Sequence, residues 1–466
     1  MKKVLIVAYY FPPVAASGAM RPLAFCRFLE SFGWSVRVLT TDPVSVHPPH
    51  PVDPQLAGKL SPGVRVEAVP HGNPVQRLLA WRDRVRAVRG AHRPVQSHEP
   101  TVIAPTNDSH SAAPGRVGSL KTFLLDWGFA FPDQQCAWLK PAVAAAKQWP
   151  QADIPDVVFA TGGPWTSLLV GKQLAEYWKV PLIADYRDPW TSNPYVSFDS
   201  AHLNAKAKEL ELSVCRTATR VITNTHELRA QLENDYPAIV GKTLTITNGF
   251  DPESFGSTQG PAGQRGQAPT VRSSRAKLEI GHFGTVYGKR TPVVLLQALS
   301  ELYQAGVVSK DQLCLKFVGA WDVKDARCEE LAQGLEKVGL LRREPPVPYQ
   351  ACLQRMSDAD ALLVIQPDSP LQIPSKIYEY IATRRPLLLV GGEGATANLV
   401  LRHRLGVVCP NVLGEIQRLV ATLVDGSREL PAPSQEEIDR FNYRSLTGDL
   451  ARVLDEVHQE QAVSAN

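Results

Sequence analysis

Residues 4–22 read VLIVAYYFPPVAASGAMRP, and this stretch indicates how the fold begins. The segment 4–10 is dense in β-branched and aromatic residues, which favour a buried strand. Pro12-Pro13 then breaks the pattern, and small residues lead into a helix. A basic start and an apolar run also suit a signal peptide, but the run is barely long enough for its hydrophobic region. We therefore expect a strand, a glycine-containing turn and a helix.

The same succession of strand, turn and helix recurs along the chain. Several predicted strands are nearly continuous apolar runs, which is typical of strands with helices on both faces of their sheet. The predicted strands after the first cover residues 35–41, 156–161, 181–188, 220–225, 244–249, 277–284, 313–320, 359–366, 386–392 and 406–410. The sequence therefore predicts an α/β protein built on doubly wound parallel sheets.

A compositional break separates two stretches of this pattern. Residues 256–275 are nearly all Gly, Pro, Ser, Gln and Arg without periodicity, which predicts a linker. We expect one α/β domain over residues 1–255 and a second over residues 276–433. A helical pattern over 434–466 could pack back on the first domain. Residues 43–118 are rich in Pro and His and have few periodic elements, so we expect an irregular surface excursion there.

Composition narrows the class of protein further. Of 466 residues, 44% are hydrophobic and 21% are charged, which excludes wholesale disorder. A net charge of +4 is too small over this length to indicate a nucleic-acid partner. The seven cysteines are scattered without a CxxC pair, so we expect reduced thiols in a cytoplasmic protein rather than disulfides or a zinc site. No apolar window is long enough to predict a membrane-spanning helix.

Four groups of polar residues follow predicted strands, which is where open α/β sheets bind ligands. Small residues and an arginine follow the first strand, where an anion would meet exposed N–H groups of a helix. The other groups combine cations or carboxylates with strand ends and helix starts. The four groups are Ser17, Gly18 and Arg21; Gly284, Lys289 and Arg290; Ser375, Lys376 and Glu379; and Asp185, Arg187 and Asp188.

Each group has a chemical interpretation and a plainer alternative. Lys289 and Arg290 stand just before a helix and would suit a diphosphate, or they are solvated surface cations. Glu379 could accept hydrogen bonds from both hydroxyls of a ribose, or it pairs with a lysine one helical turn away. The charges at 185–188 could position hydroxyl groups, or they form a buried structural ion network.

Two motifs resemble a nicotinamide-binding and a metal-binding sequence, but the residues around each motif do not fit such a site. Residues 392–397 match G-x-G-x-x-A after a strand, but the next strand ends in Cys409-Pro410, without the acidic residue that a nicotinamide site needs. The D-x-D string at 358–360 precedes a strand and therefore lies at the wrong end of the sheet. We expect no metal ion and no cofactor besides a donor substrate.

Taken together, the motifs resemble those of the GT-B glycosyltransferases, specifically glycosyltransferase family 4-like proteins. The resemblance spans nearly the whole chain and implies two Rossmann-like domains facing across a cleft, with acceptors bound by the first domain and nucleotide-sugar donors by the second. The matching segments are FPP…SG…RP, TGGPWTS, ADYRDPW, ITNGFD, HFGTVYGKRTPVVLLQAL and PSKIYEYIATRRPLLLVGG.

The resemblance also assigns roles to single residues. It implies phosphate binding by Arg290 and ribose binding by Glu379, the second glutamate of an E-x7-E motif. Leu371 stands where the first glutamate is usual, and Thr285 follows the glycine of the phosphate loop where the family usually has arginine. The family's catalytic histidine has no obvious match in this sequence; the segment TGGPW at 161–165, which includes Trp165, lies near its expected place.

The implied activity is transfer of a hexose-type sugar from a nucleotide-diphosphate donor to a hydroxyl acceptor with anomeric retention. Cell-envelope polysaccharide or glycolipid synthesis would be its setting, and a lipid-linked sugar is a candidate acceptor. We expect Asp188 to activate the acceptor, with Trp165, Asp185 and Arg187 nearby. A nonhydrolysing nucleotide-sugar epimerase and a catalytically silent nucleotide-sugar-binding subunit are the alternatives.

A basic segment raises the question of a membrane surface. Residues 77–93 hold six Arg and one Asp, with apolar residues on one predicted helical face. Such a helix suits an anionic interface, so we expect possible peripheral contact with the inner membrane face. A solvated helix packed on the domain explains the same pattern.

Overall fold

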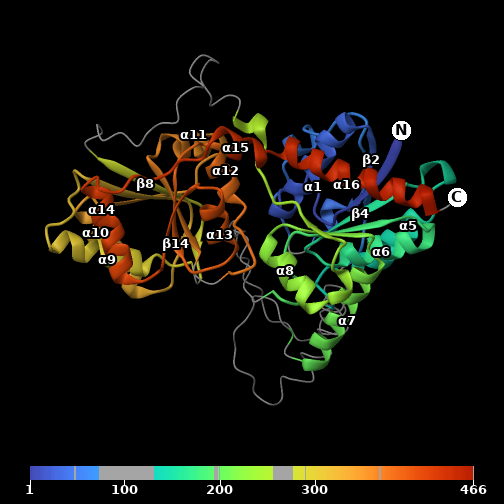
Figure 1. Ribbon diagram of the computed structural model, residues 1–466, viewed down its shortest axis with the longest axis horizontal. Coiled ribbons are helices and arrows are strands. Elements are labelled where there is room, and N and C mark those ends of the chain that lie inside the picture. The colour runs from blue at the N-terminus through green and yellow to red at the C-terminus, as the bar shows by residue number, and fades with distance from the viewer. Residues whose placement is uncertain are drawn as a thin grey trace, which may run out of the picture. The chain divides into compact units, whose positions relative to one another are not determined.

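The computed structural model describes residues 1–46, 49–72, 131–193, 198, 200–255, 277–288, 290–366 and 369–464. The predicted linker at 256–275 and the basic segment at 77–93 lie outside the described residues. The chain forms two compact units (Figure 1). Unit 1 comprises Met1–Asn224, Arg229–Ile246 and Thr447–Asn466, and unit 2 comprises Thr225–Leu228 and Thr247–Leu446.

Unit 1 is built on one parallel sheet with the strand order β3-β2-β1-β4-β5-β6-β7. All six neighbouring pairs run parallel, which confirms the predicted sheet type. The strands are β1 (Lys2–Val7), β2 (Trp34–Thr41), β3 (Arg65–Val69), β4 (Val157–Gly162), β5 (Leu182–Tyr186), β6 (Arg220–Thr223) and β7 (Thr243–Thr245).

Helices cover both faces of this sheet because successive strand residues are apolar. On β4, Phe159 packs edge-to-face on Phe25 of α1 with ring centroids 5.8 Å apart. The next residue, Ala160, faces Gly171 of α6. A Cβ added to Gly171 would lie 2.4 Å from the Cβ of Ala160. The helices are α1 (Ser17–Leu29), α2 (Pro54–Ala57), α5 (Leu139–Ala146), α6 (Thr166–Trp178), α7 (Ala201–Thr217), α8 (His226–Asp235) and α16 (Tyr443–Ser464).

The C-terminal helix α16 returns the chain to unit 1. Asp455 of this helix accepts a hydrogen bond from the indole N–H of Trp34 at 2.9 Å and pairs with Lys2. Arg220 at the start of β6 pairs with Glu460 further along α16. Figure 1 shows α16 beside α1 in this unit. Three strands that are distant in sequence are therefore attached to one helix.

The interpretation of residues 43–118 as irregular is wrong for one segment. Residues 65–69 form β3, which pairs with β2 from Arg37↔Arg65 to Thr41↔Val69. Only Val69 of this edge strand is buried. An edge strand that buries so little carries almost none of the apolar pattern from which strands are predicted.

Unit 2 repeats the plan with the strand order β12-β10-β8-β13-β14-β15 and a small two-stranded sheet, β11-β9. Again every pair is parallel. The strands are β8 (Leu278–Phe283), β9 (Val286–Tyr287), β10 (Leu313–Val318), β11 (Trp321–Asp322), β12 (Leu341–Glu344), β13 (Ala361–Gln366), β14 (Leu387–Gly391) and β15 (Gly406–Cys409).

Its helices also form two layers. Leu363 and Ile365 of β13 belong to a core with α9, α10 and α14, whereas Leu362 and Val364 belong to a core with α11, α12 and α13. Figure 1 shows these two groups of helices on opposite sides of the sheet. The helices are α9 (Val293–Gln304), α10 (Ala326–Lys337), α11 (Tyr349–Asp358), α12 (Lys376–Ala382), α13 (Ala395–Arg402), α14 (Leu413–Val424) and α15 (Gln435–Arg440).

Both main sheets reverse their strand order beside their first strand. In unit 1 the chain moves outward from β1 to β2 and β3, then crosses to β4; in unit 2 it moves from β8 to β10 and β12, then crosses to β13. In open α/β sheets a ligand crevice lies at this reversal, outside the carboxyl ends of the strands. The fold thus indicates one candidate crevice per unit, beside β1 and β4 and beside β8 and β13.

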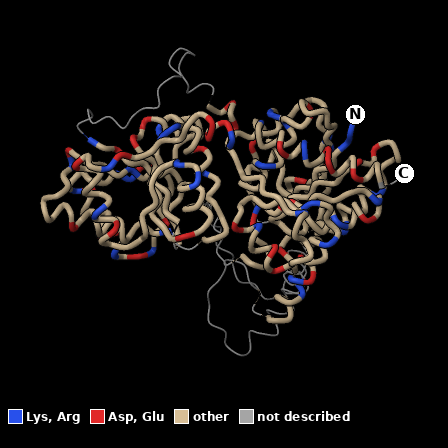
Figure 2. Tube along the Cα trace, viewed as in Figure 1, with Lys and Arg blue, Asp and Glu red and all other residues tan. Residues whose placement is uncertain are grey.

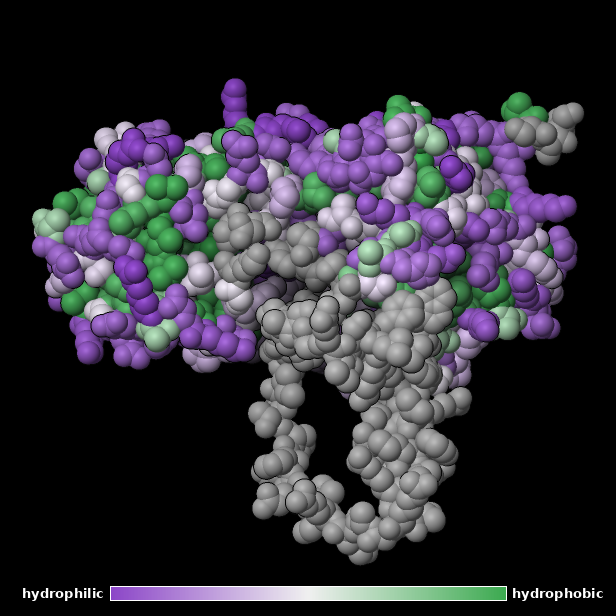
Figure 3. Space-filling view, turned by 90° about the horizontal axis from the view of Figure 1, so that it is seen from below, coloured by the Kyte–Doolittle hydropathy of each residue, from purple (hydrophilic) through white to green (hydrophobic). Residues whose placement is uncertain are grey.

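The surface of the described residues carries charges of both signs. Lys and Arg alternate with Asp and Glu over both units in Figure 2, without a long run of one sign. Figure 3 shows hydrophobic residues of unit 2 interrupted by hydrophilic ones. None of the helices that the structure describes is both long and apolar enough to cross a bilayer. Membrane contact by residues 77–93 stays a prediction.

Candidate functional site

A buried ion pair joins three elements at the carboxyl edge of the unit 1 sheet. Arg21 of α1 donates from Nη2 to Asp185 Oδ1 at 2.7 Å and from Nε to Oδ2 at 3.0 Å. Thr161 at the end of β4 donates its hydroxyl to Asp185 Oδ2 at 2.7 Å. The side chains of Arg21 and Asp185 are 3% and 0% exposed. Both carboxylate oxygens of Asp185 therefore have partners inside the protein, and the buried ion network that was the alternative interpretation is present. Acceptor binding by Asp185 stays a prediction.

Arg187, two residues further along, lies against glycines from two other segments. Its Nε donates to the Gly162 carbonyl at 2.9 Å. A Cβ added to Gly18 would lie 2.2 Å from both Nη1 and Nη2 of Arg187, so a larger residue there would displace this guanidinium. Burial lowers the pKa of Arg187, while the charge of Asp188 raises it. Gly18 and Arg187, which belong to two separate groups in the sequence, therefore meet at one point.

Gly163 and the carboxylate of Asp188 lie next to Arg187 at the same strand end. Gly163 has a φ of 89°, a left-handed conformation. A Cβ added there would lie 3.2 Å from Arg187 Nε and 3.4 Å from Asp188 Oδ2. Ser17 begins α1, whose N-terminus has no side-chain cap. Two glycines from separate segments therefore lie close to two charged side chains at this strand end.

Trp165 forms the apolar side of this edge. Its ring stacks on Trp190 with centroids 5.8 Å apart and an interplanar angle of 9°. The two rings are 8% and 2% exposed, so little of Trp165 is available to an acceptor before any movement. Next to it, Asp133 accepts hydrogen bonds from Thr166 N at 2.8 Å and Oγ1 at 2.6 Å. Burial raises the pKa of Asp133. Sequence reasoning missed Asp133, because its partner is 33 residues away.

In unit 2, the loop after β8 approaches the loop after β10. Gly284 N donates to the Val318 carbonyl at 3.0 Å. A Cβ added to Gly319, whose φ is 147°, would lie 2.2 Å from the Gly284 carbonyl oxygen. This close backbone approach explains Gly319, whereas Gly284 is favoured by its own φ of 148°. Thr285 is exposed beside them.

Arg290 stands at the far end of the same loop. Its backbone N–H donates to the Tyr287 carbonyl at 3.0 Å, and its guanidinium lies 5.6 Å from the centre of the Tyr287 ring. Lys289, the other predicted phosphate-binding cation, lies outside the described residues. The helix α9 begins at Val293, close to the predicted start.

Glu379 lies on α12, which is attached to the end of β8. The hydroxyl of Tyr380 accepts from Phe283 N at 2.7 Å and donates to the Phe283 carbonyl at 3.3 Å. Phe283 immediately precedes Gly284, where the loop to Arg290 begins. The helix α12 is therefore hydrogen-bonded to the strand end from which this loop starts. The predicted residues of the two groups are therefore brought to one edge of the sheet.

Both oxygens of Glu379 have partners. Lys376 Nζ lies 2.8 Å from Oε2, and the Tyr349 hydroxyl donates to Oε1 at 3.2 Å. The Lys–Glu pair that was the plainer alternative is thus present, and Ser375 directly precedes α12 without capping it. Sequence reasoning missed Tyr349, because nothing local links it to a glutamate thirty residues later.

The described residues contain no group of three His, Cys, Asp or Glu side chains that could hold a metal ion. Asp360, of the D-x-D string, accepts from Glu279 N at 2.9 Å at the amino end of the sheet. All seven cysteines are free thiols, as expected. Metal independence stays a prediction.

Comparisons with known proteins agree with this geometry. The profile of a family described as Glycosyltransferase Family 4 matches residues 94–254. A D-inositol 3-phosphate glycosyltransferase from Geodermatophilus obscurus is 25% identical over 220 residues, which cover 43% of this chain and 45% of that protein. The chain spans about half the length of the curated relatives it matches.

Solved structures show the same fold. Sucrose-phosphate synthase from Thermosynechococcus elongatus has a TM-score of 0.57 at 14% identity, with 100% of each chain covered. A glycosyltransferase from Rickettsia africae has a TM-score of 0.55 at 12% identity, with 98% of each chain covered. At these identities the likeness concerns the fold alone.

Two parallel-sheet α/β units of this topology define the GT-B architecture. Over residues 94–254 the chain is similar to the proteins of Glycosyltransferase Family 4.

Proposed function

We propose that the protein transfers a hexose-type sugar from a nucleotide-diphosphate donor to a hydroxyl acceptor with retention of anomeric configuration. The observation that carries this proposal is the attachment of α12 to the end of β8 by Tyr380. It brings the carboxylate of Glu379 and the cationic loop of Arg290 to one edge of a sheet, beside the reversal of strand order.

The donor chemistry follows from the charges at this edge. The leaving diphosphate becomes more negative in the transition state, and a fixed guanidinium stabilises that charge without reorganisation. We assign this role to Arg290, with Lys289 as a second cation. Glu379 would accept hydrogen bonds from ribose hydroxyls, because an ionised carboxylate is an acceptor only. The sugar itself would pass through an oxocarbenium-like state.

The acceptor is assigned to unit 1. Arg187 offers a guanidinium beside Gly18 and Gly163, and Asp188 is the candidate for activating the acceptor hydroxyl. A curated relative is named for an inositol phosphate acceptor, which supports an acceptor that carries a phosphate. A lipid-linked sugar in envelope polysaccharide or glycolipid synthesis has this chemistry too.

The proposal is tested on the full chain with a panel of nucleotide sugars. Mass spectrometry should detect release of a nucleoside diphosphate from one of them. Arg290→Ala and Glu379→Ala should each weaken binding of that diphosphate about ten-fold or more, since loss of a hydrogen bond to a charged group costs roughly 1.5–3 kcal/mol. Unchanged affinity in both folded variants would remove the donor site. Inversion at C2 without acceptor would favour an epimerase instead.

A further inference from the structure

The loop that carries Arg290 is attached to the rest of unit 2 at both of its ends. On one side β9 pairs with β11, and Val286 N makes a backbone hydrogen bond of 2.9 Å there. On the other side Thr291 Oγ1 donates to Cys328 Sγ of α10 at 3.5 Å. Only residues 287–290 lie between the two attachments. Movement of β11 or of α10 would therefore move Arg290.

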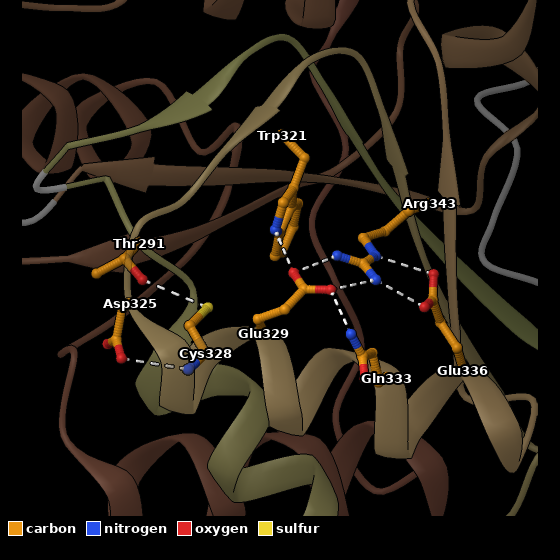
Figure 4. Close-up of polar contacts among 8 residues, drawn as sticks. All are labelled: Thr291, Trp321, Asp325, Cys328, Glu329, Gln333, Glu336 and Arg343. Atoms are coloured by element: carbon orange, nitrogen blue, oxygen red, sulfur yellow. Dashed lines mark hydrogen bonds and ion pairs between the residues drawn. The ribbon is translucent and has the colours of Figure 1, made fainter.

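Trp321 of β11 is fixed from several directions (Figure 4). Its indole N–H donates to Glu329 Oε2 at 3.1 Å. Its ring packs edge-to-face on Phe317 at 5.2 Å, and the guanidinium of Arg343 lies 4.9 Å from its centre. Because Trp321 pairs directly with Val286, these contacts determine where β9 lies.

Glu329 is in turn oriented by a two-point ion pair. Arg343 donates from Nη1 to Oε2 at 2.7 Å and from Nη2 to Oε1 at 3.0 Å, and Gln333 donates to Oε1 at 3.0 Å. These hydrogen bonds lower the pKa of Glu329 to about 2, so the carboxylate is ionised at neutral pH. Arg343, at the end of β12, also pairs with Glu336 at 2.8 Å. The acceptor of the indole N–H is thus charged and held in one place.

Cys328 and Glu329 are consecutive residues of α10, and both reach the Arg290 loop. Cys328 meets its end at Thr291, and Glu329 meets its start through Trp321. The helix start is itself capped by Asp325, whose Oδ1 accepts from Arg327 N at 2.9 Å. One short segment of α10 therefore attaches both ends of the loop.

We propose that Trp321, Glu329 and Arg343 are positioning residues for Arg290: they set the place of the loop 284–291 and so strengthen binding of the donor diphosphate without touching it. This inference rests on the proposed function, in which Arg290 contacts the diphosphate. A cluster that only fastened α10 to β12 would stabilise unit 2 but would leave the affinity for a diphosphate unchanged.

A double-mutant cycle separates these two roles. Calorimetry measures Kd for whichever of UDP, GDP or ADP the full chain binds most tightly, in wild type, Trp321→Phe, Arg290→Ala and the double variant. Phenylalanine keeps an aromatic ring but loses the indole N–H. We expect Trp321→Phe to raise Kd on the order of three- to ten-fold in the wild-type background. In the Arg290→Ala background the same change should raise Kd by less than about two-fold, because the positioned group is gone.

Glu279→Gln is the matched control, since Glu279 pairs with Lys316 at 2.8 Å in the same unit, outside the cluster of Trp321, Glu329 and Arg343. It should leave Kd within about two-fold of wild type, whatever its effect on thermal unfolding. If Trp321→Phe fails to fold, Glu329→Gln replaces it in the cycle. Equal effects of Trp321→Phe in both backgrounds, or an equal effect of the control, would overturn the positioning role alone. An unchanged Kd in Arg290→Ala would overturn the donor site and this inference together.

Discussion

Replacement of Asp185 by alanine should lower the free energy of unfolding of unit 1 by about 3–5 kcal/mol, the usual effect of removing one partner from a buried ion pair. The structure explains why the loss is large. Arg21 would keep its bond to the Ile246 carbonyl at 2.9 Å but lose both bonds to the carboxylate. The buried hydroxyl of Thr161 would also lose its acceptor. A buried guanidinium would thus lose its carboxylate partner, and a buried hydroxyl would lose its acceptor.

Urea unfolding of the full chain, followed by tryptophan fluorescence, measures this loss. Glu209→Ala is the matched control, because Glu209 pairs with Lys206 at 3.2 Å in the same unit and both side chains are exposed. Such a pair contributes about 0–1 kcal/mol. A loss below about 1 kcal/mol in Asp185→Ala, close to that of the control, would refute the structural role. Loss of acceptor use with stability intact would return Asp185 to the acceptor site.

Three further predictions concern the two edges. Gly18→Ala should reduce acceptor-dependent turnover about ten-fold or more and leave diphosphate affinity unchanged, because a Cβ 2.2 Å from the Arg187 guanidinium must displace it; normal turnover in this variant would contradict the acceptor assignment. The lowered pKa of Glu329 means that its contribution to stability is complete above about pH 4.5 and is lost as the pH falls toward about 2. Between these values, urea unfolding should show a steeper loss for wild type than for Glu329→Gln, and parallel curves would contradict it. Transfer activity should survive excess EDTA but collapse in Arg290→Ala; loss on chelation with recovery in magnesium or manganese would show that a metal neutralises the leaving group.

Much of the fold could be predicted from the local pattern of residues. Continuous apolar runs such as 156–161 and 359–366 became β4 and β13, because strands covered on both faces need apolar side chains at every position. The edge strand β3 was not predicted, because it buries only Val69 and therefore has no continuous apolar run. The glycines at 18 and 284 were recognised as turn residues, but the residues that pack near these turns could not be predicted.

The roles of the charged residues could not be predicted in this way. Asp185, Arg187 and Asp188 form one cluster of charges in the sequence. In the structure, however, Asp185 forms an ion pair with an arginine 164 positions earlier, and Arg187 packs on a glycine of α1. Likewise Glu379 was found from its helical position, but its partner Tyr349 and the attachment of Tyr380 to Phe283 were not.

The sequence by itself determined the elements of this protein and which strand ends would carry polar groups, because backbone preferences and side-chain periodicity act over a few residues. Only the tertiary structure decided which of those groups are buried in ion pairs and which pack against glycines of other segments. That outcome depends on the order of strands in each sheet, which places residues more than a hundred positions apart within hydrogen-bonding distance.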